Sequence, residues 1–205
     1  MKYYFTGLLC SLLFCANYKS VAQVYIKPAA LILVTSNTAS TIPGGNIEGS
    51  YKFADKIEVG ISVSIFPEKK SNKQFAGGLN VNYADAVNAV NAVFSYPLKT
   101  SNSKLLPFIG ADAGVNFAKQ KISFVDNSQG QFYFSKTSTN IMISPKAGIS
   151  YMVGKNSQLL LKVQYHQNLN ETEKRVIGVS SQGEAIELNP IQHYLTIGLG
   201  VAFRL

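Results

Sequence analysis

The sequence predicts an all-β fold, an eight-stranded antiparallel up-and-down barrel whose strands cross a membrane, behind an N-terminal signal peptide. Only 15% of the 205 residues are charged, well below the roughly 25% of soluble domains, while the hydrophobic share of 46% is ordinary. No apolar stretch after the N-terminus approaches the roughly 18–20 residues that a spanning helix needs. Apolar and polar residues alternate instead, over runs longer than the roughly five or six residues usual in soluble strands.

Residues 1–22 have the features of a cleaved secretory signal peptide. Lys2 precedes an apolar run over residues 5–16, and Ser20 and Ala22 are the small residues expected before a cleavage site. We expect cleavage after Ala22, which leaves residues 23–205 as one barrel domain. A first core helix is the alternative interpretation of this segment. A lipoprotein signal is excluded because large apolar residues precede both cysteines.

Both cysteines, Cys10 and Cys15, lie in this leader, so the mature chain can form no disulfide and no thiolate metal site. Loss of Lys2 and Lys19 with the leader leaves 17 basic and 11 acidic residues, a net charge of +6. A basic exported protein can meet anionic lipid or polysaccharide, and we expect no nucleic-acid partner.

The first three expected strands differ in how clearly they alternate. Residues 24–35 form an apolar run that only Lys27 and Pro28 interrupt. Residues 45–54 place Ile, Tyr and Phe opposite Glu, Ser and Lys. Residues 57–65 alternate strictly between Ile or Val and Glu, Gly or Ser. Such alternation indicates a strand with one apolar and one polar face.

Five further segments complete the eight strands. Residues 86–98 end in alternating Phe, Ser and Tyr, and residues 105–118 carry Ile, Ala, Val and Phe on one face. Residues 141–153, 159–166 and 194–205 alternate more regularly. These lengths are close to the roughly 9–11 residues of a tilted membrane-spanning strand.

Two places depart from the pattern. Apolar residues occupy odd positions in residues 79–83 but even positions in residues 94–98, which predicts a bulge or an irregular loop within residues 84–92. Pro145 falls inside the sixth strand, where it removes a donor from the ladder, and it predicts a second bulge.

The connections between strands are of two alternating kinds. Short turns follow strands two, four and six, at residues 54–56, 99–104 and 154–157. Longer polar segments follow strands one, three, five and seven, at residues 36–44, 67–85, 119–136 and 168–190. Outer-membrane barrels have short periplasmic turns and long external loops, so this order favours a membrane barrel over a soluble sandwich.

The alternation also assigns a polar set of side chains to the barrel interior. Eight strands leave an interior just wide enough for side chains to fill. We expect ion pairs and hydrogen bonds that plug the lumen, because unpaired buried charges are costly; a proton or ion path is the alternative. The inward set consists of Glu48, Lys52, Glu58, Asp112, Lys146, Lys162, His166 and Arg204.

Aromatic residues gather beside the short turns, where a girdle at the periplasmic interface is expected. The chain has no Trp, so Tyr and Phe must supply this girdle. Its expected members are Tyr51, Phe53, Phe94, Tyr96, Tyr151 and Phe203.

Two segments, residues 107–117 (PFIGADAGVNF) and residues 194–205 (YLTIGLGVAFRL), resemble small eight-stranded outer-membrane barrels of the OmpA/OmpX type. The Ala-Gln at residues 22–23 is similar to the Bacteroidetes versions of that family. The resemblance implies a Gram-negative outer-membrane location and insertion by the barrel assembly machinery. The family's assembly signal falls here on Val201, Phe203 and Leu205, with Leu at the end where the family has an aromatic residue.

The leading hypothesis is a non-enzymatic integral barrel that stabilises the outer membrane or presents loops outside the cell. We expect a monomer without cofactor, metal or catalytic residues, and with outer-membrane lipids and lipopolysaccharide as partners. Lysines of the long loops could contact lipopolysaccharide phosphates, and a solvated loop rim explains them equally well. They are Lys69, Lys70, Lys73, Lys119, Lys121 and Lys136.

Three alternatives stay open. An outer-membrane lipid-modifying enzyme would have to use His166 or His193, and neither has a nucleophile in a recognisable context beside it. A soluble lipocalin-like ligand-binding barrel would show the same alternation with its apolar face inside, but the N-terminal Gly-x-Trp and the C-terminal helix of lipocalins are missing. A porin-like passive pore would have little open bore.

Overall fold

A computed structural model describes residues 23–205 apart from 36–40, 54–56, 76–77, 99, 102–103, 127–129, 171–173 and 180–182. The signal peptide expected at residues 1–22 lies outside the described residues. The described part of the chain has no helix long and apolar enough to span a bilayer. The strands are β1 (Gln23–Thr35), β2 (Thr41–Phe53), β3 (Ile57–Gln74), β4 (Asn80–Pro97), β5 (Leu105–Asp126), β6 (Gly130–Met152), β7 (Ser157–Asn168), β8 (Arg175–Val179), β9 (Ala185–Leu188) and β10 (His193–Arg204).

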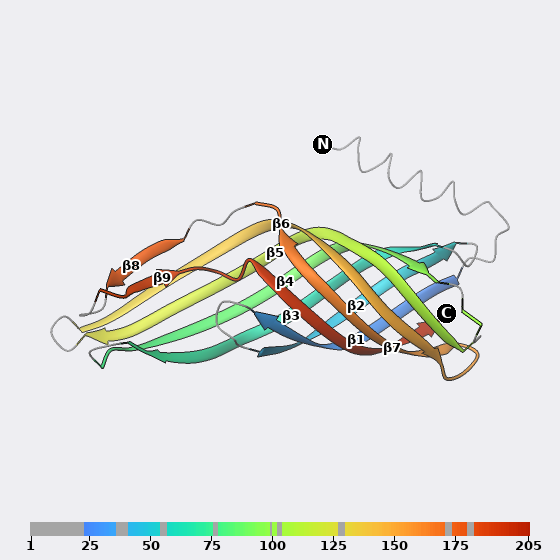
Figure 1. Ribbon diagram of the computed structural model, residues 1–205, viewed down its shortest axis with the longest axis horizontal. Coiled ribbons are helices and arrows are strands. Elements are labelled where there is room, and N and C mark those ends of the chain that lie inside the picture. Colours follow the sequence, from blue (N-terminus) through green and yellow to red (C-terminus); the bar gives the residue numbers. More distant parts are fainter. Residues whose placement is uncertain are drawn as a thin grey trace.

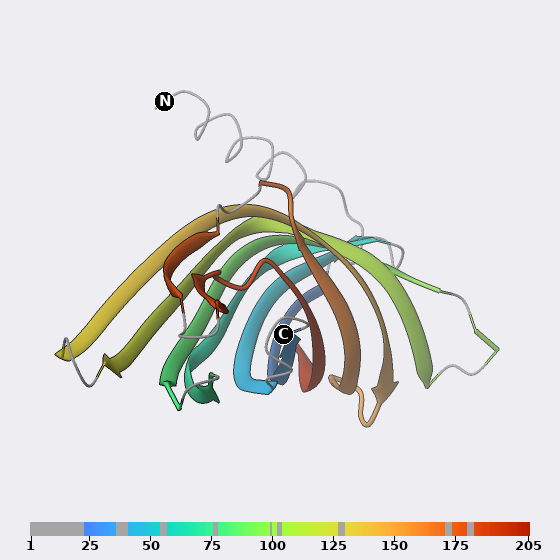
Figure 2. The same cartoon turned by 60° about the vertical axis from the view of Figure 1, so that its left-hand side comes forward.

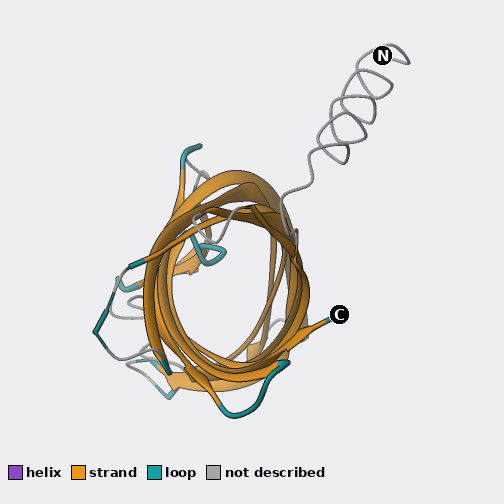
Figure 3. Cartoon of the chain, turned by 90° about the vertical axis from the view of Figure 1, so that its right-hand side faces the viewer, coloured by secondary structure: helices purple, strands orange, loops and turns teal. Residues whose placement is uncertain are grey.

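Eight of these strands close into one antiparallel barrel (Figures 1 and 3). Each strand from β1 to β7 pairs with the next, β7 pairs with β10, and β10 closes on β1. This topology confirms the predicted all-β, eight-stranded up-and-down barrel. The sequence did not predict β8 and β9, which form a separate two-stranded sheet inside the last long connection.

The register of the strands sets their tilt. The path of paired residues leads from Gln23 once around the barrel and returns to β1 at Leu33, ten residues further along. An eight-stranded barrel with this offset has strands tilted by about 40°, as is usual for barrels. Because of the tilt, side chains that meet inside the barrel lie at positions that alternation alone cannot match.

The two faces of the barrel wall differ in polarity. Outward side chains are mostly Ile, Val, Leu, Phe and Tyr that stay exposed, as Ile61, Val163 and Leu199 illustrate. Inward side chains of the half nearer the short turns are mostly Lys, Glu, Asp, Asn and Ser, and most are buried. In water this arrangement would leave the apolar face unburied, so it fits a lipid surround.

The aromatic residues expected in the periplasmic girdle lie at the ends of strands near the short turns. The rings of Tyr51 and Phe53 are 4.4 Å apart in an edge-to-face arrangement. The side chains of Phe94, Tyr96, Tyr151 and Phe203 are exposed on the outer face of the wall. These positions suit rings that lie at a lipid–water boundary.

Strands β3 to β6 continue far beyond the apolar band on the side opposite the short turns. β5 has 22 residues and β6 has 23, about twice what a spanning strand needs. The segments expected as long loops, residues 67–85 and 119–136, are therefore mostly strand. Their polar composition reflects strands that stand in water, which the sequence pattern did not distinguish from loops. Figure 2 shows them spreading as a curved sheet, here named the outer extension.

The register shift lies on β3, and the bulge predicted within residues 84–92 is absent. β4 alternates inward and outward without a break and keeps a single register with β5. The pairing of β3 with β4 shifts instead between Phe66 and Lys69. The change in apolar parity has a different cause: Val81 and Val87 of β4 are buried on the inner face.

The bulge predicted at Pro145 is absent as well. Ile143 pairs with Gln167 and Lys146 pairs with Gln164, so the register of β6 with β7 is the same on both sides of the proline. Pro145 is exposed on the outer face of the wall. The missing N–H therefore interrupts the ladder locally without displacing it.

The β8–β9 sheet covers the concave side of the outer extension (Figure 2). Ile186 and Leu188 of β9 join Ile122 and Phe124 of β5 and Val81 of β4 in one buried apolar cluster. A sheet standing outside lipid needs such a cover, because burial of an apolar face supplies most of its stability.

Gly114 of β5 lies where neighbouring strands approach closely. A Cβ atom at this position would lie 2.1 Å from the Val90 carbonyl oxygen and 2.5 Å from Asn91 Oδ1. Because backbone would have to shift, Gly114→Ala is expected to lower the free energy of unfolding by about 1–3 kcal/mol, measured by urea unfolding in detergent micelles. At Gly49 a Cβ would meet nothing within 4 Å, so Gly49→Ala is the control. Equal stability of the two variants would contradict this expectation.

Candidate functional site

The half of the lumen nearer the short turns holds a buried ionic network. Lys27 of β1 lies between two carboxylates: its Nζ is 2.9 Å from Glu48 Oε1 and also contacts Glu58. Lys162 of β7 reaches the same group, because its Nζ donates to Asn46 Oδ1 at 3.2 Å and lies 3.9 Å from Glu48 Oε2. Pairing of this kind offsets the desolvation of the buried charges.

A second ion pair completes the network across the barrel. Lys146 Nζ of β6 lies 2.7 Å from Asp112 Oδ1 of β5, and both side chains are buried. Asp112 Oδ2 also accepts a hydrogen bond from Gln164 Nε2 at 2.7 Å. Both oxygens of this carboxylate therefore have partners, as a buried carboxylate requires.

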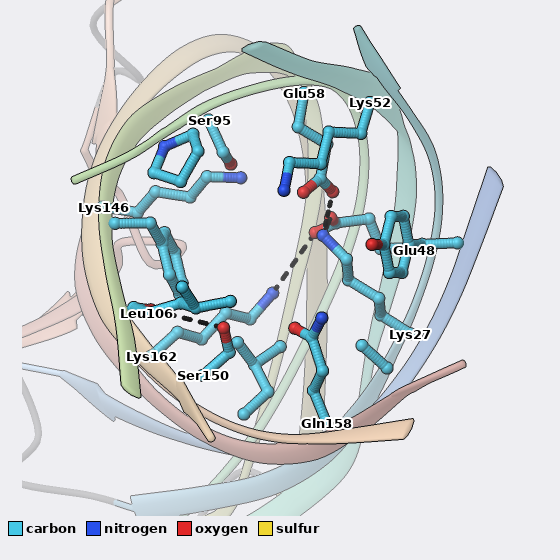
Figure 4. Close-up of a pocket in the computed structure, with 15 residues that line it drawn as sticks. Lys27, Glu48, Lys52, Glu58, Ser95, Leu106, Lys146, Ser150, Gln158 and Lys162 are labelled. Atoms are coloured by element: carbon cyan, nitrogen blue, oxygen red, sulfur yellow. Dashed lines mark hydrogen bonds and ion pairs between the residues drawn. The ribbon is translucent and has the colours of Figure 1, made fainter. Parts of the chain in front are cut away.

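A cavity of about 50 Å³ lies among these side chains. Figure 4 shows them converging on it from the barrel wall, with side chains of β1, β2, β6 and β7 pointing inward. The cavity is placed near the short turns, since Pro97 and Leu106 at the ends of β4 and β5 also line it. Its charged lining residues are Lys27, Glu48, Lys52, Glu58, Lys146 and Lys162.

An apolar cluster fills the lumen on the other side of the network. It draws side chains from β1 to β5, from β10 and from the segment before β10, and all are buried. The sequence predicted a polar plug, and this apolar plug went unrecognised because its inward residues were counted with the apolar runs. Its members are Leu31, Leu33, Ile42, Phe66, Val87, Ala118, Ile191 and Tyr194.

His166 lies next to the apolar plug and is held by two hydroxyl groups. Its Nδ1 is 2.9 Å from Ser144 Oγ, and its Nε2 is 3.0 Å from Thr196 Oγ1. Its ring stacks on that of Tyr194 at 4.3 Å between centroids. His166 is only 2% exposed and Ser144 is 0% exposed, so this serine and histidine have no access for a substrate.

Two solved structures share this architecture over most of the chain. A major outer membrane protein from Thermus thermophilus matches with a TM-score of 0.57 and 11% identity, covering 90% of this chain and 100% of that chain. The outer membrane protein OprG from Pseudomonas aeruginosa matches with a TM-score of 0.55 and 13% identity, covering 91% and 97%. No protein-family model and no curated protein sequence matches the chain. The fold is that of small outer-membrane β-barrels.

In this outer-membrane barrel, the structure places most of the predicted lumen residues in one network. Glu48, Lys52, Glu58, Asp112, Lys146 and Lys162 surround or adjoin the cavity. His166 lies apart from them, among the hydroxyl groups described above. Arg204 lies instead at the periplasmic rim, where its guanidinium donates to Asn156 Oδ1 at 2.9 Å.

The sequence prediction missed Lys27, which contacts two carboxylates of the network. The signal was present, because Lys27 follows Tyr25 with the inward parity of β1. It was hidden because Leu31 and Leu33, further along the same inward face, belong to the apolar plug. Both faces of β1 therefore look apolar in the sequence, and the lysine looks like an interruption.

Outside the lumen, a row of lysines crosses the outward face of the barrel just beyond the apolar band. Ala84 of β4 pairs with Lys70 of β3 on one side and with Lys121 of β5 on the other. Lys119 is exposed two residues beyond Phe117, an exposed aromatic residue of the band on β5. Small side chains between the lysines leave their ammonium groups accessible from the membrane side.

Glu68 lies within this lysine row. The hydrogen bond from Lys121 holds the pKa of the Glu68 carboxyl below its usual value, and Lys70 and Lys119 lower it further. The same contact raises the pKa of Lys121. At neutral pH the row therefore carries three positive charges and one negative charge, a net attraction for anions.

The remaining predicted positions lie at the two ends of β10. Phe203 and Leu205 are exposed on the outer face at the periplasmic end, and Val201 precedes them on the same face. His193 is exposed at the opposite end of the strand. No group of three His, Cys, Asp or Glu side chains within the described residues is arranged to hold a metal ion.

Proposed function

We propose that this protein is a non-enzymatic integral barrel of the bacterial outer membrane that anchors and presents its outer extension at the cell surface. It is exported with cleavage after Ala22 and inserted through the assembly signal at Val201, Phe203 and Leu205, and it acts as a monomer. The observation that carries the proposal is the lysine row directly beyond the apolar band. The band suits lipid tails, and the row lies at the height of the headgroups.

The filled lumen supports an anchoring role over a transport role. The ionic network occupies one half of the bore, and the apolar plug occupies the other. A passive pore needs a continuous aqueous path, which these side chains fill. Within the described residues, the cavity at the network is too small for a solute larger than a few waters.

The orientation of the wall argues against a soluble lipocalin-like barrel. Such a barrel would enclose its Ile, Val and Leu side chains around a ligand and expose the charged face. Here Ile61 and Leu199 face outward, whereas Glu48 and Lys162 face inward and are buried. The two faces are therefore the reverse of what a soluble ligand-binding barrel needs.

A lipid-modifying activity also lacks support. Ser144 and His166 are within hydrogen-bonding distance, but both are enclosed in the wall and lumen and contact no cavity in the described structure. Lipid outside the barrel cannot reach them without opening the wall. His193 is exposed, yet it has no hydroxyl or carboxylate partner among the contacts of the described residues.

The lysine row should bind phosphate groups of the outer-leaflet lipid. Lys70→Gln/Lys119→Gln is expected to weaken binding to vesicles containing lipid A by about 10- to 30-fold, since each lysine near an anionic surface contributes about 1 kcal/mol. This variant leaves Lys121 in place, so Glu68 keeps its partner. The measurement is the dissociation constant of the detergent-purified protein, by titration.

The control removes two lysines on the opposite side of the barrel. Lys104→Gln/Lys155→Gln makes the same change of charge at the periplasmic turns and should leave lipid A binding unchanged. Vesicles of dephosphorylated lipid A provide the second comparison. If all three proteins bind both vesicles equally, the lysine row has no role in lipid recognition and the proposal fails.

A further inference from the structure

The charged groups in the periplasmic half of the lumen do not balance. Within the described residues, three carboxylates belong to the network there: Glu48, Glu58 and Asp112. Four lysines line the cavity beside them: Lys27, Lys52, Lys146 and Lys162. With every group ionised, this region carries one positive charge more than its carboxylates compensate.

An excess charge of this kind is unfavourable in a membrane-enclosed lumen. The desolvation of an ion costs several kcal/mol unless a counter-charge and hydrogen bonds replace its water. Lys162 illustrates the shortage, since its nearest carboxylate oxygen, on Glu48, is 3.9 Å away, and Lys27 lies closer to that same carboxylate at 2.9 Å. Two ammonium groups therefore share one carboxylate.

The cavity lies where a counter-ion could neutralise this excess. Figure 4 shows the ammonium groups of Lys146 and Lys162 pointing into the same space from β6 and β7. Ser95, Ser150 and Gln158 also line it and can donate hydrogen bonds. Its volume of about 50 Å³ admits a few water-sized particles, each of which needs about 10–15 Å³. A sugar, a nucleotide or a lipid headgroup is too large.

We propose that this cavity binds one small inorganic anion of the size of chloride, which supplies the missing negative charge of the ionic network. The anion enters from the periplasmic side, because residues next to the short turns line the cavity and the apolar plug closes the other half of the lumen. The site is separate from the lysine row, so it does not depend on lipid binding.

Anion-dependent stability of the folded barrel tests this proposal. The full mature chain in detergent is heated in sodium chloride, sodium bromide or sodium gluconate at one ionic strength, and the loss of the folded gel band is followed. Chloride and bromide are expected to raise the midpoint temperature by at least about 2–4 °C in a saturable way. Gluconate is too large for the cavity and should have no such effect.

The variant Lys52→Gln removes one ammonium group from the half-buried mouth of the network and brings the charges into balance. Its midpoint temperature should not depend on chloride, whereas Lys155→Gln, in an exposed turn, should keep the wild-type response. A chloride effect of equal size in both variants would overturn the proposal.

Diffraction from wild-type crystals soaked in bromide provides a test that needs no variant. An anomalous peak in the cavity beside Lys146 and Lys162 is the expected result. A lumen without an anomalous peak, together with equal stability in chloride and gluconate, would show that water or a neutral lysine balances the network instead.

Discussion

Replacing Lys27 with Met is expected to lower the free energy of unfolding by about 3–5 kcal/mol, because it leaves Glu48 and Glu58 buried or half-buried without their shared cation. Lys27 is itself buried, and it contacts both carboxylates. Met keeps the length and apolar stem of the side chain, so the loss reports on charge more than on packing. The midpoint of urea unfolding in micelles, at neutral pH, measures the effect.

The control for this prediction is Lys155→Met, which removes a lysine from the exposed periplasmic turn and should change stability by less than about 0.5 kcal/mol. The double variant Lys27→Met/Glu48→Gln should recover part of the loss, because it removes one of the two stranded charges. If Lys27→Met is as stable as Lys155→Met, the ionic network contributes little to the fold.

Placing Arg at Ile61 is expected to destabilise the folded barrel by about 2–4 kcal/mol when it is folded into lipid vesicles, as for a charge near the middle of a bilayer. Ile61 is 64% exposed at the centre of the outward face of β3. On a soluble protein, a substitution at so exposed a position would change stability by only about 0.5 kcal/mol. The result therefore measures the surround of the barrel directly.

Val125 provides the matched position. It is 59% exposed and also faces outward, but it lies near the tip of β5, in the outer extension. Val125→Arg should be nearly neutral in the same vesicles. Equal effects of Ile61→Arg and Val125→Arg would contradict the assignment of a lipid-facing band that ends before the outer extension.

The hairpin order and the faces of the strands were readable from the sequence because alternation has a period of two and each spanning strand has a lipid face. Ile57 to Ile65 and Leu159 to Tyr165 show this most clearly. The same reasoning failed beyond the lipid. Outside the membrane the outward face becomes polar, so residues 67–85 and 119–136 look like loops although they are strands.

Irregular features were predicted less well because one pattern can have two causes. The parity change before residue 94 indicated a bulge in the sequence, but it arises where inward Val81 and Val87 join apolar clusters. The true shift in register lies on β3, between Phe66 and Lys69, where no change of apolar parity announced it. A proline inside a strand likewise need not displace the ladder when it faces outward, as Pro145 does.

The sequence by itself determined the class of fold, the number of spanning strands, their order and the residues of opposite charge that point inward. It could do so because each of these depends on local alternation and on the length of a strand. The tertiary structure alone decided which charges meet. Lys27 reaches Glu58, and Asp112 pairs with Lys146, because barrel closure and strand tilt bring residues from distant strands together inside the lumen.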